Sequence, residues 1–253
     1  MNQSVIKLLG VFLVSWLSVD RLPARDATNF EAGNAAFHTD DYTQAAVIYQ
    51  KLIDSEGSSA SLLYNLGNSQ FQLGDHGAAI LSYERAKLIA PRDPDLLANL
   101  ILARKAATVF PDIKYNPWLD RMLGFLSRDE WSWWVVVAAF WIGVMAISGK
   151  FTRNARPWLR KLRWGSMLIS AIIILLGGVI LFLRRDEGLR GIVISELAAV
   201  RLSPFEKAEA VGNPGAGRSV QIGEKKGGYY FVQVPGTDLQ GWMDRTEVKR
   251  IEP

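Results

Sequence analysis

The sequence contains no cysteine and only two histidines, His38 and His76, among its 253 residues. Without a thiol the chain can form no disulfide, offer no thiolate nucleophile and supply no cysteine ligand to a metal. Neither H-E-x-x-H nor G-x-S-x-G occurs, and the segment GVMAISGKF (143–151) lacks the spacing and the Ser or Thr of a phosphate-binding loop. We therefore expect a protein that is not an enzyme and holds no cofactor or metal.

Charged residues are absent from two long stretches of the chain. One covers the 19 residues 131–149 and the other the 20 residues 164–183. Twenty residues in a helix span about 30 Å, the thickness of the bilayer hydrocarbon core. Both stretches predict transmembrane helices, with buried core helices of a soluble protein as the alternative. Tryptophan, which prefers the headgroup layer, clusters in or beside them at positions 118, 131, 133, 134, 141, 158 and 164.

Acidic residues are absent from the segment that joins these two stretches. GKFTRNARPWLRKLRWG (149–165) has six basic residues, although the net charge of the whole chain is only +4. Such a segment could neutralise nucleic-acid phosphates, or it could be a cytoplasmic loop between two spans. Its flanks favour a basic cytoplasmic loop over 150–163 that contacts membrane lipid, and we expect no nucleic-acid partner. The residues expected to set the topology and contact lipid are Lys150, Arg153, Arg156, Arg160, Lys161 and Arg163.

The N-terminus supports the same topology. Lys7 precedes the short apolar run LLGVFLVSWLSV, the length and charge order of a signal peptide, so residues 1–24 are predicted to be a signal peptide or an N-terminal anchor. If this segment directs export, the chain up to the first span lies outside the cytoplasm, and the second span returns the C-terminus to that side. A short juxtamembrane segment, 110–130, would precede the first span.

A repeat of 34 residues fills the region 26–109. Five pairs of identical residues recur at this spacing: Gly33 and Gly67, Asn34 and Asn68, Phe37 and Phe71, Ala45 and Ala79, and Tyr49 and Tyr83. This period and these residues resemble the tetratricopeptide repeat, a helical hairpin that stacks on its neighbours. Residues 94–107 continue the period as one more helix, opened by Asp93 as N-cap and Pro94, which gives about two and a half repeats.

The resemblance implies a concave surface made by the first helix of each hairpin. Side-chain amides on it could pair with the backbone of a protein or peptide partner without demanding charge. A clamp for a terminal carboxylate is not expected, because Phe30, Asp95 and Asn99 stand where such repeats carry basic residues. The expected partner-binding residues are Phe30, Asn34, Phe37, Asn65, Asn68, Phe71 and Asn99.

From residue 189 to 253 the pattern changes to short β-prone runs separated by glycine and proline, which predicts a small all-β barrel. The order AAVRLSP, GRSVQIGEKKGGYYFVQV and QGWMDRTEVKRI resembles the bacterial SH3 (SH3b) domain. SH3b domains elsewhere accompany cell-wall enzymes, so this resemblance implies peptidoglycan as a candidate ligand. The aromatic ligand surface would consist of Tyr229, Tyr230 and Trp242, although strand alternation sends one of the two tyrosines inward.

The fold class expected from these segments is a multi-domain membrane protein, with an α-helical tetratricopeptide array, two transmembrane helices and a small SH3b barrel. This order resembles the BatE-type family of bacterial aerotolerance (Bat) operons. The resemblance implies a scaffold in the bacterial inner membrane with its repeats and SH3b domain on the periplasmic side. It implies von Willebrand A-domain membrane proteins and a MoxR-type ATPase system as partners. The alternative is a cell-wall sensor whose SH3b domain binds peptidoglycan.

Overall fold

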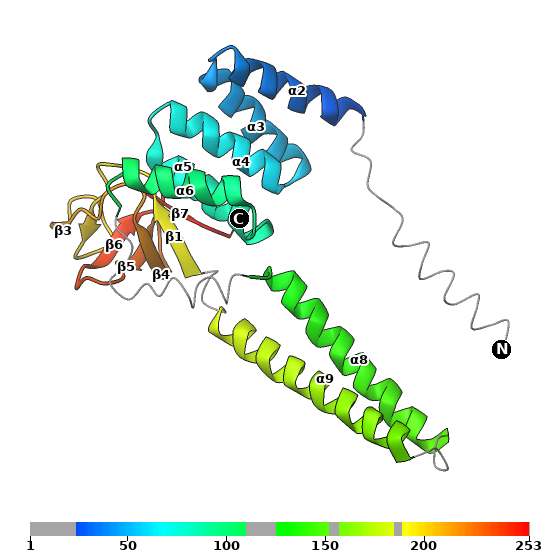
Figure 1. Cartoon of the computed structure of the whole chain (residues 1–253). Helices are drawn as coiled ribbons and strands as arrows, with labels where there is room; N and C mark the ends of the chain where they lie inside the picture. The colour runs from blue at the N-terminus through cyan, green and yellow to red at the C-terminus, as the bar shows by residue number, and fades with distance from the viewer. Residues whose placement is uncertain (1–23, 110–124, 152–156, 185–188, 253) are drawn as a thin grey trace.

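The computed structural model describes residues 24–109, 125–151, 157–184 and 189–252 (Figure 1). Residues 1–23 of the predicted signal segment, most of the predicted juxtamembrane segment, and Arg153 and Arg156 of the basic segment lie outside these residues.

The N-terminal part consists of helices that pair as antiparallel hairpins (Figure 1). Aspartate or serine caps four of them, because the side chains of Asp41, Ser59, Asp75 and Asp93 each accept a hydrogen bond from a backbone N–H of the first turn. Asp93 and Pro94 open the last helix as expected from the sequence. The helices are α2 (Ala24–His38), α3 (Tyr42–Glu56), α4 (Ala60–Gln72), α5 (His76–Ile89) and α6 (Pro94–Ala106).

The repeated glycines allow the two helices of each hairpin to pack closely against each other. A Cβ on Gly67 would lie 2.6 Å from Cε1 of Tyr83, and a Cβ on Gly33 would lie 2.7 Å from Cε1 of Tyr49. Tyr49 and Tyr83 are both buried. The 34-residue recurrence of glycine and tyrosine is therefore one packing contact made twice.

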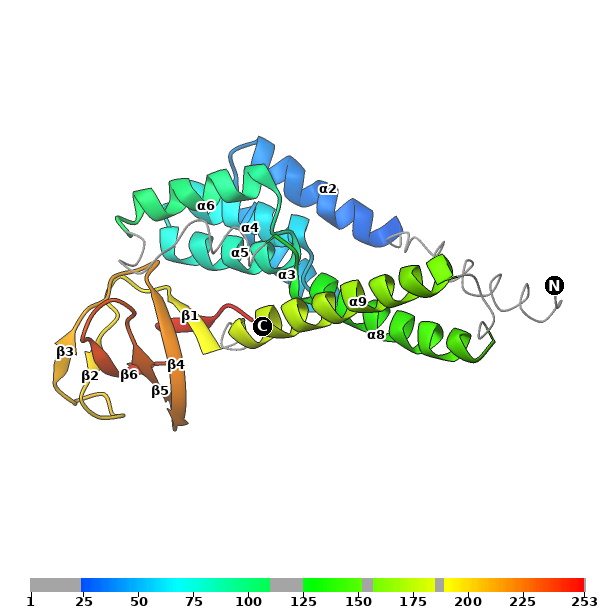
Figure 2. The same ribbon diagram turned by 60° about the horizontal axis from the view of Figure 1, so that its bottom comes forward.

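Two long helices follow and form an antiparallel pair that projects away from the rest of the molecule (Figures 1 and 2). They are α8 (Arg128–Phe151) and α9 (Pro157–Leu183), and both are long and apolar enough to cross a membrane. Only 6% of the most apolar part of α8 and 17% of that of α9 are buried, and large side chains such as Trp133, Phe140 and Leu175 are exposed. This exposure argues against the alternative of buried core helices.

Small residues hold α8 and α9 together. Gly177 of α9 faces Val135 of α8, where a Cβ would lie 2.5 Å from a valine methyl group, and Ala138 and Ser170 are buried. Close approach of small residues is typical of helix pairs in membranes. Both helices extend further than the apolar stretches of the sequence, so Arg160, Lys161 and Arg163 lie on the first turns of α9 and not in a loop.

The C-terminal part is an antiparallel sheet in the order β3-β2-β6-β5-β4-β1-β7. Its core includes Val193, Val220, Val232 and Met243. The strands are β1 (Arg190–Val193), β2 (Val200–Arg201), β3 (Ala210–Gly212), β4 (Ser219–Lys226), β5 (Tyr229–Gln233), β6 (Gln240–Asp244) and β7 (Val248–Arg250).

The expectation of a closed barrel is wrong. A barrel requires hydrogen bonds between its first and last strands, and in the described part of the chain β3 and β7 end the sheet without pairing with each other. At the end of β7 and just after it, the backbone instead accepts hydrogen bonds from the repeats. Arg85 of α5 donates from Nη2 to the carbonyl of Arg250 at 2.9 Å and from Nε to that of Ile251 at 3.2 Å.

The repeats and the sheet share one hydrophobic core. Ile192 of β1 and Ile251 lie in the same buried cluster as Leu63, Ile80 and Leu96 of the repeats. Helix α5 contacts β1, and Figures 1 and 2 both show the sheet lying beside the helical stack. The two parts therefore pack as one body.

Candidate functional site

The expected concave face carries a row of four asparagines from α2, α4 and α6, which are bonded in two pairs. Asn65 Nδ2 lies 3.4 Å from Asn34 Oδ1, and Asn99 Nδ2 donates to Asn68 Oδ1 at 2.9 Å. Asn99 Nδ2 also lies 3.0 Å from the hydroxyl oxygen of Tyr64. The structure thus brings together the four asparagines that the sequence singled out.

Buried tyrosines hold two of these amides in place. Tyr49 donates its hydroxyl proton to Asn34 Oδ1 at 2.7 Å, and Tyr83 donates to Asn68 Oδ1 at 2.8 Å. Burial raises the pKa of both phenols, so they remain neutral donors at physiological pH. In both bonds the hydroxyl donates and the amide oxygen accepts, so the Nδ2 end of each asparagine points away from its tyrosine.

This arrangement directs the Nδ2 groups of Asn34 and Asn68 away from the buried tyrosines. Both carbonyl oxygens are used twice, and within the described ranges neither Nδ2 donates to another group. Both side chains are partly exposed. Two oriented N–H donors about one repeat apart can donate hydrogen bonds to the carbonyl oxygens of a bound backbone.

A cavity of about 280 Å³ lies at the centre of this face. Its lining residues carry no charge: they are Phe37, Asn68, Phe71, Gln72, Tyr83, Asn99 and Leu102. An uncharged lining of rings, amides and one leucine suits an apolar or uncharged polar side chain. We call this cavity with the asparagine row the repeat groove.

Six of the seven expected partner-binding residues lie in the repeat groove, and one does not. Phe37, Asn68, Phe71 and Asn99 line the cavity, and Asn34 and Asn65 form the adjoining part of the row. Phe30 does not line it, because its ring packs 6.0 Å from that of Tyr49 in the first hairpin. The sequence reasoning missed Gln72 and Leu102, although they follow Asn68 and Asn99 by four and three residues, the spacing of neighbours on one helix face.

The aromatic residues of the sheet separate onto two faces. Tyr230 packs against the sheet core, with the guanidinium groups of Arg245 and Arg250 within 5.6 Å of its ring centre. Trp242 lies opposite Phe231, and their rings meet edge to face at 5.6 Å. Tyr229 shares the Phe231 side of its strand by alternation. The outward surface is thus Tyr229, Phe231 and Trp242, and Phe231 also lines a cavity of about 270 Å³.

The comparisons with known proteins bear on the repeats. Residues 60–93 match the family model for the tetratricopeptide repeat. This match spans α4 and α5, the second of the two hairpins expected from the sequence, and indicates a protein-interaction module that is typically non-catalytic. No curated protein matches the chain significantly.

Metal ligation finds no support in the described part of the chain. Within residues 24–109, 125–151, 157–184 and 189–252, no three His, Asp or Glu side chains gather closely enough to hold a metal ion.

Proposed function

We propose that the protein is a non-catalytic, membrane-anchored scaffold whose repeat groove binds a segment of a partner protein. The observation that carries this proposal is the pair of amide donors on Asn34 and Asn68, which buried tyrosines orient toward the groove. A protein segment offers them backbone carbonyls, and the uncharged cavity beside Asn68 accommodates one of its side chains. The ligand segment is therefore expected to be uncharged where it contacts the cavity.

We further propose that this scaffold works in a Bat/MoxR-type envelope-stress assembly in the bacterial inner membrane. The repeats and the sheet then lie on the periplasmic side, and the basic end of the helix pair lies in the cytoplasm. The order of repeats, helix pair and β domain supports this proposal through its resemblance to BatE-type proteins. The exposed apolar surfaces of α8 and α9 support the membrane part. Von Willebrand A-domain membrane proteins are the expected partners.

Two adjacent residues of α6 provide a matched test. Leu102 lines the cavity and is 53% exposed, whereas Ile101 is 63% exposed and does not line it. We expect Leu102→Glu to reduce partner recovery at least tenfold after in-vivo crosslinking and purification in mild detergent, because it places a charge in an uncharged cavity. Ile101→Glu should leave recovery unchanged. Equal recovery with both variants would contradict binding in the groove.

A second candidate function is a cell-wall sensor whose β domain binds peptidoglycan. The outward Phe231 and Trp242 rings beside a cavity favour it, because aromatic surfaces stack on sugar rings. This function predicts that the full chain in detergent is retained on purified sacculi and that Trp242→Ala abolishes retention. Trp133→Ala, which changes an exposed tryptophan of α8, is the control. Wild-type protein that passes through the sacculi would exclude the sensor.

A further inference from the structure

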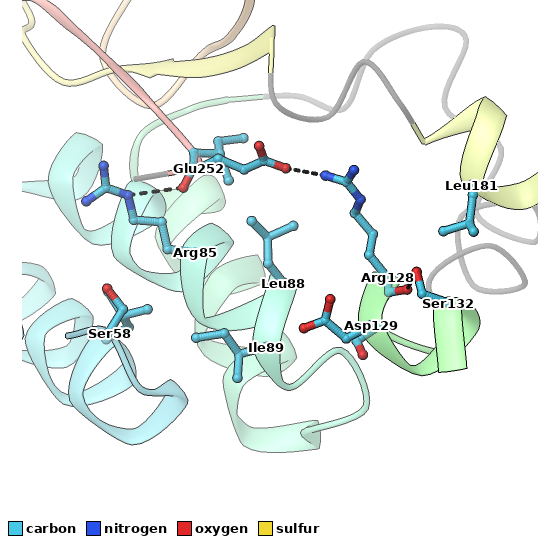
Figure 3. Close-up of a pocket in the computed structure, with 12 residues that line it drawn as sticks. Ser58, Arg85, Leu88, Ile89, Arg128, Asp129, Ser132, Leu181 and Glu252 are labelled. Atoms are coloured by element: carbon cyan, nitrogen blue, oxygen red, sulfur yellow. Dashed lines mark hydrogen bonds and ion pairs between the residues drawn. The ribbon is translucent and has the colours of Figure 1, made fainter. Parts of the chain in front are cut away.

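A further cavity lies where the repeats, the helix pair and the C-terminus meet. It has a volume of about 560 Å³, within the range of small-molecule sites. Figure 3 shows Leu88 and Ile89 of α5 between Arg85 on one side and Arg128 and Asp129 of α8 on the other. Leu181 of α9 completes the apolar part. We call this the junction cavity.

The junction cavity lies at the level of the lipid headgroups if α8 and α9 span a membrane. With 24 and 27 residues, the helices are about 36 and 40 Å long, more than the roughly 30 Å of hydrocarbon. Their ends therefore project into the headgroup layer. Arg128 and Asp129 belong to the first turn of α8, and Leu181 belongs to the last turn of α9. A ligand in this cavity could keep apolar chains against the exposed sides of both helices.

Charges of both signs line this cavity in equal number. Arg85 and Arg128 supply two guanidinium groups, and Asp129 and Glu252 supply two carboxylates. Arg128 Nη1 bonds to Glu252 Oε1 at 2.6 Å, and Arg85 bonds to the backbone through Nε and Nη2. In the part of the chain that the structure describes, the Asp129 carboxylate makes no ion pair. A purely anionic ligand would meet two repulsive carboxylates, so a ligand with one charge of each sign fits better.

We propose that the junction cavity binds the headgroup of a zwitterionic aminophospholipid. Its phosphate contacts the guanidinium groups of Arg85 and Arg128, and its ammonium contacts Asp129 with Glu252. Guanidinium N–H groups donate charge-assisted hydrogen bonds to phosphate oxygens, and an ammonium donates them to carboxylates. The acyl chains then follow Leu181 down the helix pair. This inference rests on the proposed membrane anchoring of α8 and α9.

Native mass spectrometry of the full chain, delipidated in mild detergent, tests the proposal. Phosphatidylethanolamine and phosphatidylglycerol with the same acyl chains are added separately. We expect phosphatidylethanolamine to bind several times more tightly, and Asp129→Asn to weaken it about tenfold, the loss of one charge-assisted contact. Asp238→Asn, a change of the same chemistry at an exposed aspartate of the β domain, should have no effect.

Two results would overturn the proposal. One is equal binding of the two lipids, with no effect of Asp129→Asn. The other is displacement of the lipid by soluble glycerophosphoethanolamine at the same concentration, which would assign the site to a free phosphoamine. Carbonate extraction of membranes separates this failure from failure of the proposed anchoring. Chain that stays in the washed membranes but shows no lipid preference refutes the lipid site alone, and chain that is released refutes both.

Discussion

Asn68 combines a structural contact and a candidate binding contact in one side chain. Its Oδ1 accepts hydrogen bonds from the buried Tyr83 hydroxyl and from Asn99, while its Nδ2 faces the repeat groove. We expect Asn68→Ala to lower the free energy of unfolding by about 1–3 kcal/mol, because Tyr83 would keep a buried hydroxyl without an acceptor. Asn65→Ala, which removes only a 3.4 Å contact, should cost less than 1 kcal/mol. Chemical denaturation of the full chain in detergent measures both.

Replacing Asn68 with aspartate separates the two roles. Asn68→Asp keeps an acceptor for Tyr83 and Asn99 but removes the donor that faces the groove. We expect a folded variant that no longer recovers the partner. Full recovery of the partner with Asn68→Asp would show that the Nδ2 group takes no part in binding.

The buried carboxylate of Glu84 predicts a pH dependence. Burial alone would raise its pKa, but attraction from Arg104, Lys87 and Arg190 outweighs burial and lowers the pKa from 4.5 to about 2. Since the folded-state pKa is depressed, its contribution to stability is fully present above about pH 4.5. It is lost as the pH falls from there to about 2. The shift corresponds to roughly 3 kcal/mol.

Thermal unfolding between pH 2 and 7 checks this prediction. The melting temperature of the wild-type chain should fall over that acidic interval, and Glu84→Gln should lose this part of the slope while being less stable at neutral pH. An identical pH profile for Glu84→Gln would contradict the assignment. Glu224→Gln, at an exposed position in β4, is the matched control.

At the scale of elements, α5 contacts both the other repeat helices and the sheet. One side packs in the repeat stack, and Arg85 bonds two carbonyls next to the C-terminal edge of the sheet. We expect Arg85→Ala to lower the free energy of local opening of β1 and β7 by about 2 kcal/mol. This corresponds to about thirtyfold faster amide exchange in those strands.

Hydrogen exchange of the full chain, read by mass spectrometry, measures this effect. Lys105→Ala, which removes an exposed cation from α6, should leave exchange in β1 and β7 unchanged. If Arg85→Ala also leaves them unchanged, the two hydrogen bonds do not hold the sheet edge against the repeats.

Local elements were predictable from the sequence because their causes are local. Asp93 and Pro94 mark the start of α6 within a few residues, and the recurrence of Gly67 and Tyr83 at 34 residues reflects contact inside one hairpin. The open sheet was not predictable in this way. Arg85 donates a hydrogen bond to the backbone at its edge, although Arg85 lies 166 residues from Ile251 in the chain. No residue spacing in the sequence indicates a contact of this kind.

At the scale of the whole molecule, the parts meet at one end of the helix pair. Arg92 pairs with Glu130 at 2.7 Å, and Arg128 pairs with Glu252 at 2.6 Å. These exposed pairs contribute at most about 1 kcal/mol each. The buried Arg184 donates to the carbonyl of Leu126 at 2.8 Å and connects the last turn of α9 to the start of α8. The sequence predicted which segments would occur but not this junction, because its members come from four separated regions.

For the molecule as a whole, the central proposal is that a membrane-anchored repeat groove binds a protein partner. Photo-crosslinking in intact cells tests it most directly, with the crosslinking amino acid placed at Leu102 in the groove or at Val47, an exposed residue of α3 that does not line it. We predict a discrete protein adduct from position 102 in the membrane fraction and none from position 47. No adduct at position 102, or equal adducts at both positions, would contradict the account.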